Sequence, residues 1–172
     1  QTANVMVANS PFFSFAEMAG KKFRTSQGEV KEFSGVVPVS LPLEEVFTAF
    51  TGGTVDMAEF GTLYYNVGLG INDAAKYGIY PDFWNVSNVE CTVVNKNAWD
   101  KLPEDLKTLV NNTFRAYAIR TTTILEYRSA QTMKKYYDEG SMKFIRLPAE
   151  DMSKARQKMR EIQVKYAKEK GE

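Results

Sequence analysis

The stretch GVVPVSLPLEEVFTAFTGGTVDMAEF, residues 35–60, places a strand, a helix and another strand in succession. Its first run, Val36 to Ser40, is rich in β-branched residues, and Pro38 indicates an edge position or a strand end because proline donates no ladder hydrogen bond. Pro42 opens the helix and Gly52-Gly53 ends it. The run TVDMAEF predicts the second strand. This alternation is typical of an α/β fold.

The chain on either side continues the alternation. SFAEMAGKKFR predicts a short helical turn that ends at Gly20 and a strand through Phe23, whereas the residues before it, broken by Asn9, Ser10 and Pro11, indicate a loop. AAKYGIYPDFW predicts a turn and a strand, NVECTVVN (88–95) is the clearest strand, and KFIRL predicts another. The order β, β, α, β, α, β, β, long α, β, α indicates a mostly parallel sheet.

A long helix is predicted from Pro103 to about Asp138, because apolar residues recur there at every third or fourth position without a breaker. At 1.5 Å per residue this helix is roughly 50 Å long, which exceeds the usual diameter of a domain. It therefore either spans two lobes or kinks near Thr121–Thr123, where β-branching lowers helix propensity. A last helix is predicted after Pro148.

Composition excludes several classes of function. A length of 172 residues allows one domain, or one domain and part of another. The net charge of +1 argues against a nucleic-acid-binding surface. The absence of histidine excludes Ser-His-Asp and Cys-His catalysis and most catalytic zinc sites.

Cys91 lies in an apolar run, so we expect a buried, inert thiol. The first ten residues lack the basic and apolar regions of a signal peptide, so we expect none there.

Several side chains have two interpretations on residue type alone. Arg24 ends a predicted strand in KKFRTSQG, where it is either an exposed surface charge or a clamp for a carboxylate. Glu59 is either a structural carboxylate or a ligand-contacting one. The aromatic residues Phe60, Tyr64 and Trp84 either pack in a core or line a cleft.

A family resemblance bears on these choices. GKKFRTSQG, VVPVSLPLEEVFTAFTGGTVDMAEF, AAKYGIYPDFW and VVNKNAWDKLPEDLK follow one another between Gly20 and Lys107. Together they resemble the periplasmic solute-binding proteins of TRAP transporters, the DctP family. AEFGTLYYNVGLG and KYGIYPDFW are most similar to the branch that binds 2-oxo acids and related monocarboxylates.

The resemblance implies an α/β fold with lobes like those of type II periplasmic binding proteins, each with a parallel or mixed sheet. One long helix spans the lobes, and the ligand is closed in the cleft between them. Family chains are considerably longer on the amino-terminal side, so this chain resembles their carboxy-terminal part only.

The implied division has five segments. Residues 1–58 are part of the second lobe, 59–86 form a hinge and cleft segment, and 87–102 form a return strand and helix. Residues 103–139 are the long spanning helix, and 140–172 are the carboxy-terminal strand and helix.

The resemblance also implies a ligand site. Arg24 corresponds to the arginine that pairs with the ligand carboxylate, a role that suits its planar, permanently charged guanidinium. Glu59 and Phe60 correspond to residues that ligate a Na⁺ or Ca²⁺ ion beside the ligand, Phe60 through its backbone carbonyl. Asn85 stands where the branch has a second acidic residue, so its amide would contact the ligand directly. Tyr64 and Trp84 are expected to line the cleft, and no cofactor is required.

The implied function is that of a periplasmic, extracytoplasmic receptor. It would capture a small organic acid, such as a 2-oxo acid, and deliver it to the membrane permease subunits of a TRAP transporter. One alternative is an assembly protein that interacts through the long helix, a helix that would also support a homodimer. The other is an enzyme with Glu59, Asp56 or Glu90 as a general acid or base, but no nucleophile–base pair, phosphate loop or metal cluster supports it.

Overall fold

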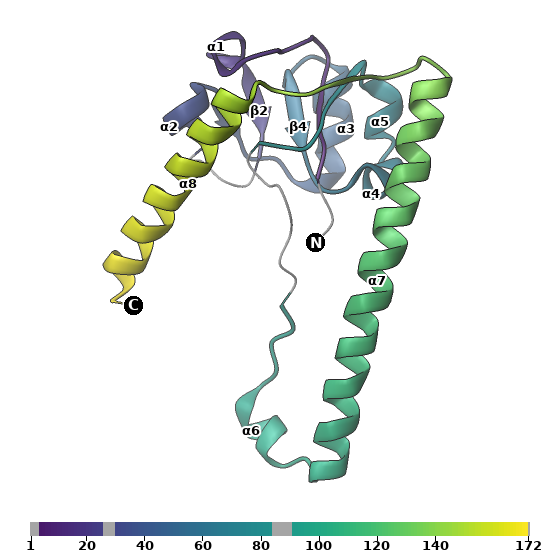
Figure 1. The fold of residues 1–172 in the computed structure, drawn as a ribbon, viewed down its shortest axis with the longest axis vertical. Helices are drawn as coiled ribbons and strands as arrows, with labels where there is room; N and C mark the ends of the chain where they lie inside the picture. The colour runs from purple at the N-terminus through teal and green to yellow at the C-terminus, as the bar shows by residue number, and fades with distance from the viewer. Residues whose placement is uncertain (1–3, 26–29, 84–90, 172) are drawn as a thin grey trace.

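A single mixed sheet organises the structure. The computed structural model describes residues 4–25, 30–83 and 91–171. In these ranges six strands pair in the order β3-β2-β4-β1-β5-β6. In chain order the strands are β1 (Met6–Ala8), β2 (Lys22–Arg24), β3 (Val37–Val39), β4 (Met57–Glu59), β5 (Tyr77–Ile79) and β6 (Lys143–Ile145). Figure 1 shows the sheet between two groups of helices, with one long helix projecting away from it.

The stretch around residues 35–60 forms the parallel part of the sheet, as predicted. β2 lies between β3 and β4 and runs parallel to both, with Arg24 opposite Val39 on one side and Ala58 on the other. The helix α3 (Leu43–Thr51) connects β3 to β4 across β2. Because the strands are parallel, their carboxyl ends meet at one edge of the sheet, and this places Arg24 and Glu59 close together.

The first strand corrects the sequence prediction. The amino-terminal segment was expected to be a loop, but β1 lies inside the sheet and pairs antiparallel with both β4 and β5. The side chains of β1 and of Val5 just before it alternate between the two faces: Met6 and Ala8 enter one core, whereas Val5 and Val7 enter the other. Three residues give too short a pattern to identify a strand, and its two neighbours in the sheet define it.

Two apolar cores lie on opposite faces of the sheet. The first is covered by α1 (Phe15–Met18), α2 (Lys31–Ser34) and α8 (Ala149–Lys170), and it includes Phe12, Phe15, Met18, Phe23, Phe83 and Ala155. The second is covered by α3, α4 (Leu63–Val67), α5 (Ile71–Ala74) and the end of α7 (Glu104–Asp138), and it includes Val46, Phe50, Leu63, Ile71, Tyr136 and Met142. Figure 1 shows the two groups of helices on either side of the sheet.

α7 is one continuous helix of 35 residues, with no break at Thr121–Thr123. Its carboxy-terminal turns pack against α4, and the rest extends away from the sheet (Figure 1). We call residues 91–124 the arm. No residue of the arm is buried in the structure as described, although it carries Val93, Val94, Leu106, Leu109, Phe114, Tyr117, Ile119 and Ile124.

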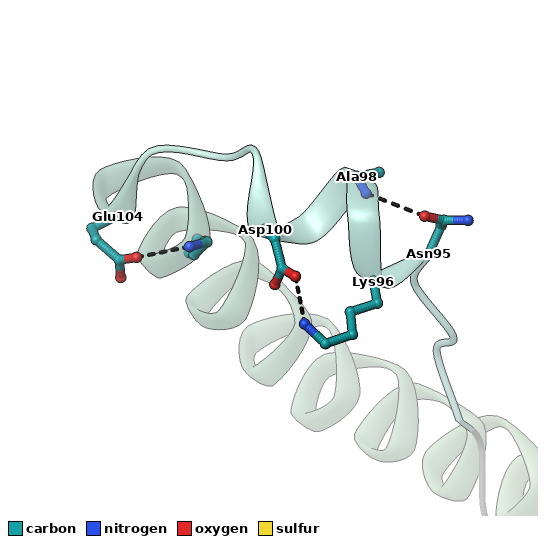
Figure 2. A network of polar contacts seen from close by, with 6 residues as sticks. Asn95, Lys96, Ala98, Asp100 and Glu104 are labelled. Carbon is teal, nitrogen blue, oxygen red and sulfur yellow. Dashed lines mark hydrogen bonds and ion pairs between the residues drawn. The ribbon is translucent and has the colours of Figure 1, made fainter.

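Local contacts hold the tip of the arm, where α6 (Lys96–Asp100) meets α7. Figure 2 shows the Asn95 side chain accepting a hydrogen bond from the Ala98 N–H at 3.2 Å, and Lys96 paired with Asp100. At the start of α7, Lys107 contacts Glu104 at 2.8 Å. These contacts join residues three or four positions apart, so they shape the tip without attaching it to the sheet.

The structure of the arm contradicts two further predictions, the strand over 88–95 and the buried Cys91. Residues 91–95 are not a strand, although the sequence predicts one over 88–95; residues 88–90 lie outside the described ranges. Cys91 is exposed, not buried. Both errors have the same cause: a strand and its core form only where a neighbouring strand supplies hydrogen bonds and apolar cover, and Val93 remains 92% exposed. Among the described helices, none is both long and apolar enough to cross a membrane.

Candidate ligand-binding site

Arg24 is the last residue of β2 and lies half-buried at the carboxyl edge of the sheet. Its Nη1 donates to the Glu59 carbonyl oxygen at 2.8 Å, and its Nη2 donates to the Leu41 carbonyl oxygen at 3.2 Å. Glu59 ends the neighbouring strand β4, and Leu41 lies between β3 and α3. Backbone carbonyls of two other segments of the parallel unit therefore hold the guanidinium.

The electrostatics favour an anion beside Arg24. Partial burial lowers the pKa of Arg24, while the nearby Glu59 carboxylate acts to raise it. A guanidinium stays charged in proteins all the same. Its Nε is buried and finds no acceptor among the described residues, and only two of its five N–H groups donate in the bonds above. A cation with donors to spare and partial desolvation has the properties of a carboxylate anchor.

Two aromatic rings, Phe60 and Tyr65, lie in sequence beside this cation. The Arg24 Cζ lies 5.6 Å from the centroid of the Phe60 ring, a distance at which a guanidinium interacts favourably with a ring face. The Tyr65 ring contacts the Phe60 ring at a tilt, with ring centroids 5.4 Å apart and an interplanar angle of 39°. Sequence reasoning selected Tyr64 and missed Tyr65. The sequence signal that could have indicated Tyr65 is its position in a short helix that begins a few residues after Glu59.

The helix that carries Tyr65 is fixed at its amino-terminal end by two contacts. Thr62 caps α4, since its Oγ1 accepts the Tyr65 N–H at 3.2 Å, and Thr62 is itself buried. Asn72, at the start of α5, donates through its Nδ2 to the Leu63 carbonyl oxygen at 2.7 Å. The Tyr65 backbone is therefore held rigidly beside Phe60.

The other predicted site residues have different positions. Tyr64 lies next to α7, with its backbone N–H 3.4 Å from Ser129 Oγ, and the residue is 40% exposed. Its role in a cleft stays a prediction. Trp84 and Asn85 lie outside the described residues. The structure thus brings Arg24, Glu59 and Phe60 together.

A cation site receives limited support. Glu59 is buried at the predicted position, and its own backbone carbonyl is occupied by Arg24. Over residues 4–25, 30–83 and 91–171, no three acidic, cysteine or histidine side chains gather in a metal-binding arrangement. Ca²⁺ takes six to eight oxygen ligands. A calcium ion beside Glu59 would therefore need further oxygen ligands, and the adjacent guanidinium repels a cation.

The enzyme alternative gains no support from the carboxylates it would use. Asp56 accepts the Lys22 backbone N–H at 2.8 Å, which ties β2 to the start of β4. Glu59 is buried at the end of β4, where its carboxylate interacts electrostatically with Arg24. Glu90 lies outside the described residues.

Comparison with known proteins places the chain in a family. The family of bacterial extracellular solute-binding proteins, family 7 (DctP), matches residues 1–170. The chain belongs to this family. The resemblance read from the sequence is confirmed, and the family description agrees with the predicted extracytoplasmic location.

Two curated DctP-family relatives show how much of such a protein is present here. A monocarboxylate 2-oxoacid-binding periplasmic protein from a Nostoc species is 34% identical over 94 residues, which are 54% of this chain and 26% of the relative. The C4-dicarboxylate-binding periplasmic protein DctP of Rhodobacter capsulatus is 24% identical over 153 residues, 86% of this chain and 44% of the relative. The chain thus spans less than half the length of either relative.

Solved structures confirm the fold. A TRAP transporter solute-binding protein from Bordetella bronchiseptica superposes with a TM-score of 0.80 at 22% identity, covering 96% of this chain and 50% of that one. That protein was solved as a mixed-occupancy dimer with copurified calcium and picolinate in one active site. The ectoine-binding protein of Halomonas elongata gives a TM-score of 0.77 at 18% identity, covering 99% and 56%. The predicted α/β class and the long helix of TRAP solute-binding proteins are thereby confirmed.

Proposed function

We propose that this chain forms one lobe of an extracytoplasmic receptor that binds a small organic acid and delivers it to a TRAP membrane permease, without catalysis. The single observation that carries the proposal is the environment of Arg24. Its guanidinium is held by two backbone carbonyls and a ring face, and it still has donors for a carboxylate. The names of the relatives, which include 2-oxoacid and C4-dicarboxylate binders, support an acid as the ligand class.

The arm supports the proposal that a second lobe completes the receptor. Its apolar side chains are exposed along α6 and α7, and residues 91–95 have a strand-type sequence without a partner in the described structure. Exposed apolar surface on this scale is typical of an interface. We propose that the rest of a longer polypeptide covers the arm and that residues 91–95 pair there. The five-segment division, with its hinge over 59–86 and spanning helix over 103–139, belongs to this proposal.

Two finer points stay proposals. A Na⁺ or Ca²⁺ ion beside the ligand would need oxygen atoms from beyond the described residues in addition to Glu59. The Bordetella bronchiseptica relative was solved with calcium, which keeps this proposal open. A homodimer through α7 is the alternative covering of the arm, and the oligomeric state of the full-length gene product distinguishes it from an interface within one chain.

The decisive test is the binding of small acids to the full-length gene product. A panel of 2-oxo acids, C4-dicarboxylates and aliphatic monocarboxylates is titrated by calorimetry and checked by thermal shift. A bound acid at a hundredfold excess over its Kd stabilises the protein by about 2.7 kcal/mol. Binding of no acid in the panel contradicts the receptor function.

Arg24→Ala then tests the anchor. The variant is expected to weaken binding by at least about tenfold, because hydrogen bonds to a charged group contribute about 1.5–3 kcal/mol each. Arg24→Lys keeps the charge but loses the two-pronged geometry, so an intermediate loss is expected. Arg156→Ala, on the exposed surface of α8, is the control. An Arg24→Ala protein that folds and binds with unchanged affinity refutes the anchor.

A further inference from the structure

Arg24, Phe60 and Tyr65 contact one another in that order. The Arg24 Cζ lies 5.6 Å from the centroid of the Phe60 ring, and the Tyr65 ring centroid lies 5.4 Å from the same point. The contacts among the described residues therefore connect Tyr65 to the guanidinium through Phe60. A change at Tyr65 would reach Arg24 by way of the Phe60 ring.

Arg24 needs a third contact to fix the plane of its guanidinium. Its Nη1 and Nη2 are held by the carbonyl oxygens of Glu59 and Leu41. These bonds leave the plane free to tilt about the line that joins the two nitrogens, and such a tilt turns the remaining N–H groups away from a ligand. Because the pairing of arginine with a carboxylate is planar and two-pronged, its strength depends on that plane. The Phe60 ring beside the guanidinium restricts the tilt.

Tyr65 is built to hold the Phe60 ring, which is itself only partly buried. The Tyr65 side chain folds back over the residues before α4, so that a Cβ atom at Gly61 would lie 3.7 Å from Tyr65 Cβ and 3.9 Å from its Cγ. The Gly61 carbonyl oxygen accepts the Val5 N–H at 3.1 Å, and Thr62 Oγ1 accepts the Tyr65 N–H at 3.2 Å. Tyr65 therefore lies on a segment that is fixed beside β1.

We propose that Tyr65 is a positioning residue of the binding site: it holds the Phe60 ring against Arg24 and thereby fixes the plane of the guanidinium for a ligand carboxylate. This inference rests on the proposed function, because it requires that Arg24 binds an acid. Tyr65 acts on the charge anchor that all ligands share. Its loss therefore weakens every bound acid by a similar factor, whereas the loss of a residue that touches the ligand body affects some acids more than others.

The binding of three acids to the full-length gene product tests this role. Pyruvate, 4-methyl-2-oxopentanoate and succinate share a carboxylate but differ in size and charge, and calorimetry measures their Kd. An aromatic contact contributes about 0.5–1.5 kcal/mol beyond its buried area, so Tyr65→Leu is expected to weaken each bound acid roughly three- to tenfold. Tyr65→Phe keeps the ring and is expected to bind like the wild type. Tyr137→Leu, at a residue that is 73% exposed on α7, is the matched control.

A double-mutant cycle tests whether Tyr65 acts through Phe60. In a Phe60→Leu protein, Tyr65→Leu is expected to weaken binding by less than a further factor of about two, because the ring that it holds is gone. NMR of the ligand-free protein gives a second readout. The Nε–H of Arg24 is buried, and its signal is assigned by its loss in Arg24→Lys. This proton is expected to exchange with solvent faster in Tyr65→Leu than in the wild type or Tyr65→Phe.

Three results overturn the inference. The first is an unchanged Kd or an unchanged exchange rate of the Arg24 Nε–H in a folded Tyr65→Leu protein. The second is a loss that differs between the acids, which indicates direct contact with the ligand. The third is a full loss that persists in the Phe60→Leu protein. A wild-type protein that binds no carboxylate of the larger panel overturns the receptor function itself, and the exchange rate then still shows whether Tyr65 holds Arg24.

Discussion

The sheet with its covering helices, here called the sheet domain, and the arm both contain large apolar side chains. In the sheet domain many of these side chains are buried, whereas in the arm none is. Phe50, on α3, is fully buried between the sheet and its neighbouring helices. Phe114, on the projecting part of α7, is 41% exposed. Both lie in helices, but the apolar residues of α3 gather on one face, whereas those of α7 do not over its whole length. Burial also depends on which segment lies opposite the helix, and that segment is not given by the local pattern.

The same contrast exists within α7 itself. Near its end, Tyr136 is buried and its hydroxyl donates to Asp73 Oδ1 at 2.6 Å, which ties the helix to α5. Its first turns have no such neighbour in the structure as described. Hydrogen bonds inside the helix keep both parts helical, so the helix is continuous although its surroundings change along its length.

Core substitutions should give the largest contrast. In the 172-residue chain, Phe50→Ala is expected to lower the free energy of unfolding by about 3–5 kcal/mol, because it leaves a cavity in the second core. Phe114→Ala is expected to change it by less than about 0.5 kcal/mol, because Phe114 is exposed on the projecting part of α7. Denaturant unfolding monitored by circular dichroism measures both.

The full-length gene product sharpens this comparison. If a second lobe covers the arm, Phe114→Ala should there become destabilising by about 2–4 kcal/mol. A negligible effect in both forms would show that Phe114 stays exposed, and it would contradict the proposed covering of that part of the arm. A loss that depends on protein concentration would indicate the homodimer instead.

The anchor of α7 should give an intermediate effect. Tyr136→Phe removes the hydrogen bond to Asp73 and keeps the ring in the core, so we expect a loss of about 1–2 kcal/mol. Burial, followed by the Asp73 contact, raises the pKa of Tyr136 well above its usual value near 10. The unfolded chain therefore loses this proton first as the pH rises.

The sign of the pH dependence follows. The contribution of Tyr136 to stability is complete below about pH 10 and falls as the pH rises above that value. Unfolding measured between neutral and alkaline pH should show this decline in the wild type and a smaller one in Tyr136→Phe. Identical slopes in the two proteins would show that Tyr136 is not the responsible group.

Helix caps should give the smallest contrast. Thr62→Ala is expected to cost about 1 kcal/mol of global stability, because Thr62 is buried and caps α4 within the sheet domain. Asn95 caps α6 with the same geometry, but α6 lies at the tip of the arm. Asn95→Ala should therefore speed hydrogen exchange in α6 and leave global unfolding unchanged. An equal loss of global stability in both variants would show that the arm unfolds together with the sheet domain.

Sequence patterns predicted the elements whose signals are local. The proline start and glycine end of α3, the strands at residues 22–24, 37–39 and 57–59, and the full extent of α7 all follow from turn residues and periodicity. The pattern failed for β1, which is only three residues long, and for residues 91–95, whose β-branched residues have no partner strand. In both cases the deciding contact involves a segment distant in sequence.

The candidate site divides in the same way. Arg24, Glu59 and Phe60 could be selected from the motifs, because each stands at the end of a predicted strand or directly after it. Tyr65 could not be preferred over Tyr64, since the two are adjacent and the rotation of a five-residue helix decides which ring reaches Phe60. Only the packed helix shows that Tyr64 lies toward α7.

By itself, the sequence determined the α/β class, the long helix, the family and the cation at the end of β2. These depend on residue type and spacing, which act over a few turns or a few strand residues. The tertiary structure alone decided that β1 lies inside the sheet, that two carbonyls and Phe60 hold Arg24, and that no residue of the arm is buried in the structure as described. Those outcomes depend on surfaces that meet only when segments distant in sequence pack together, because burial and hydrogen-bond partners belong to pairs of segments and not to one.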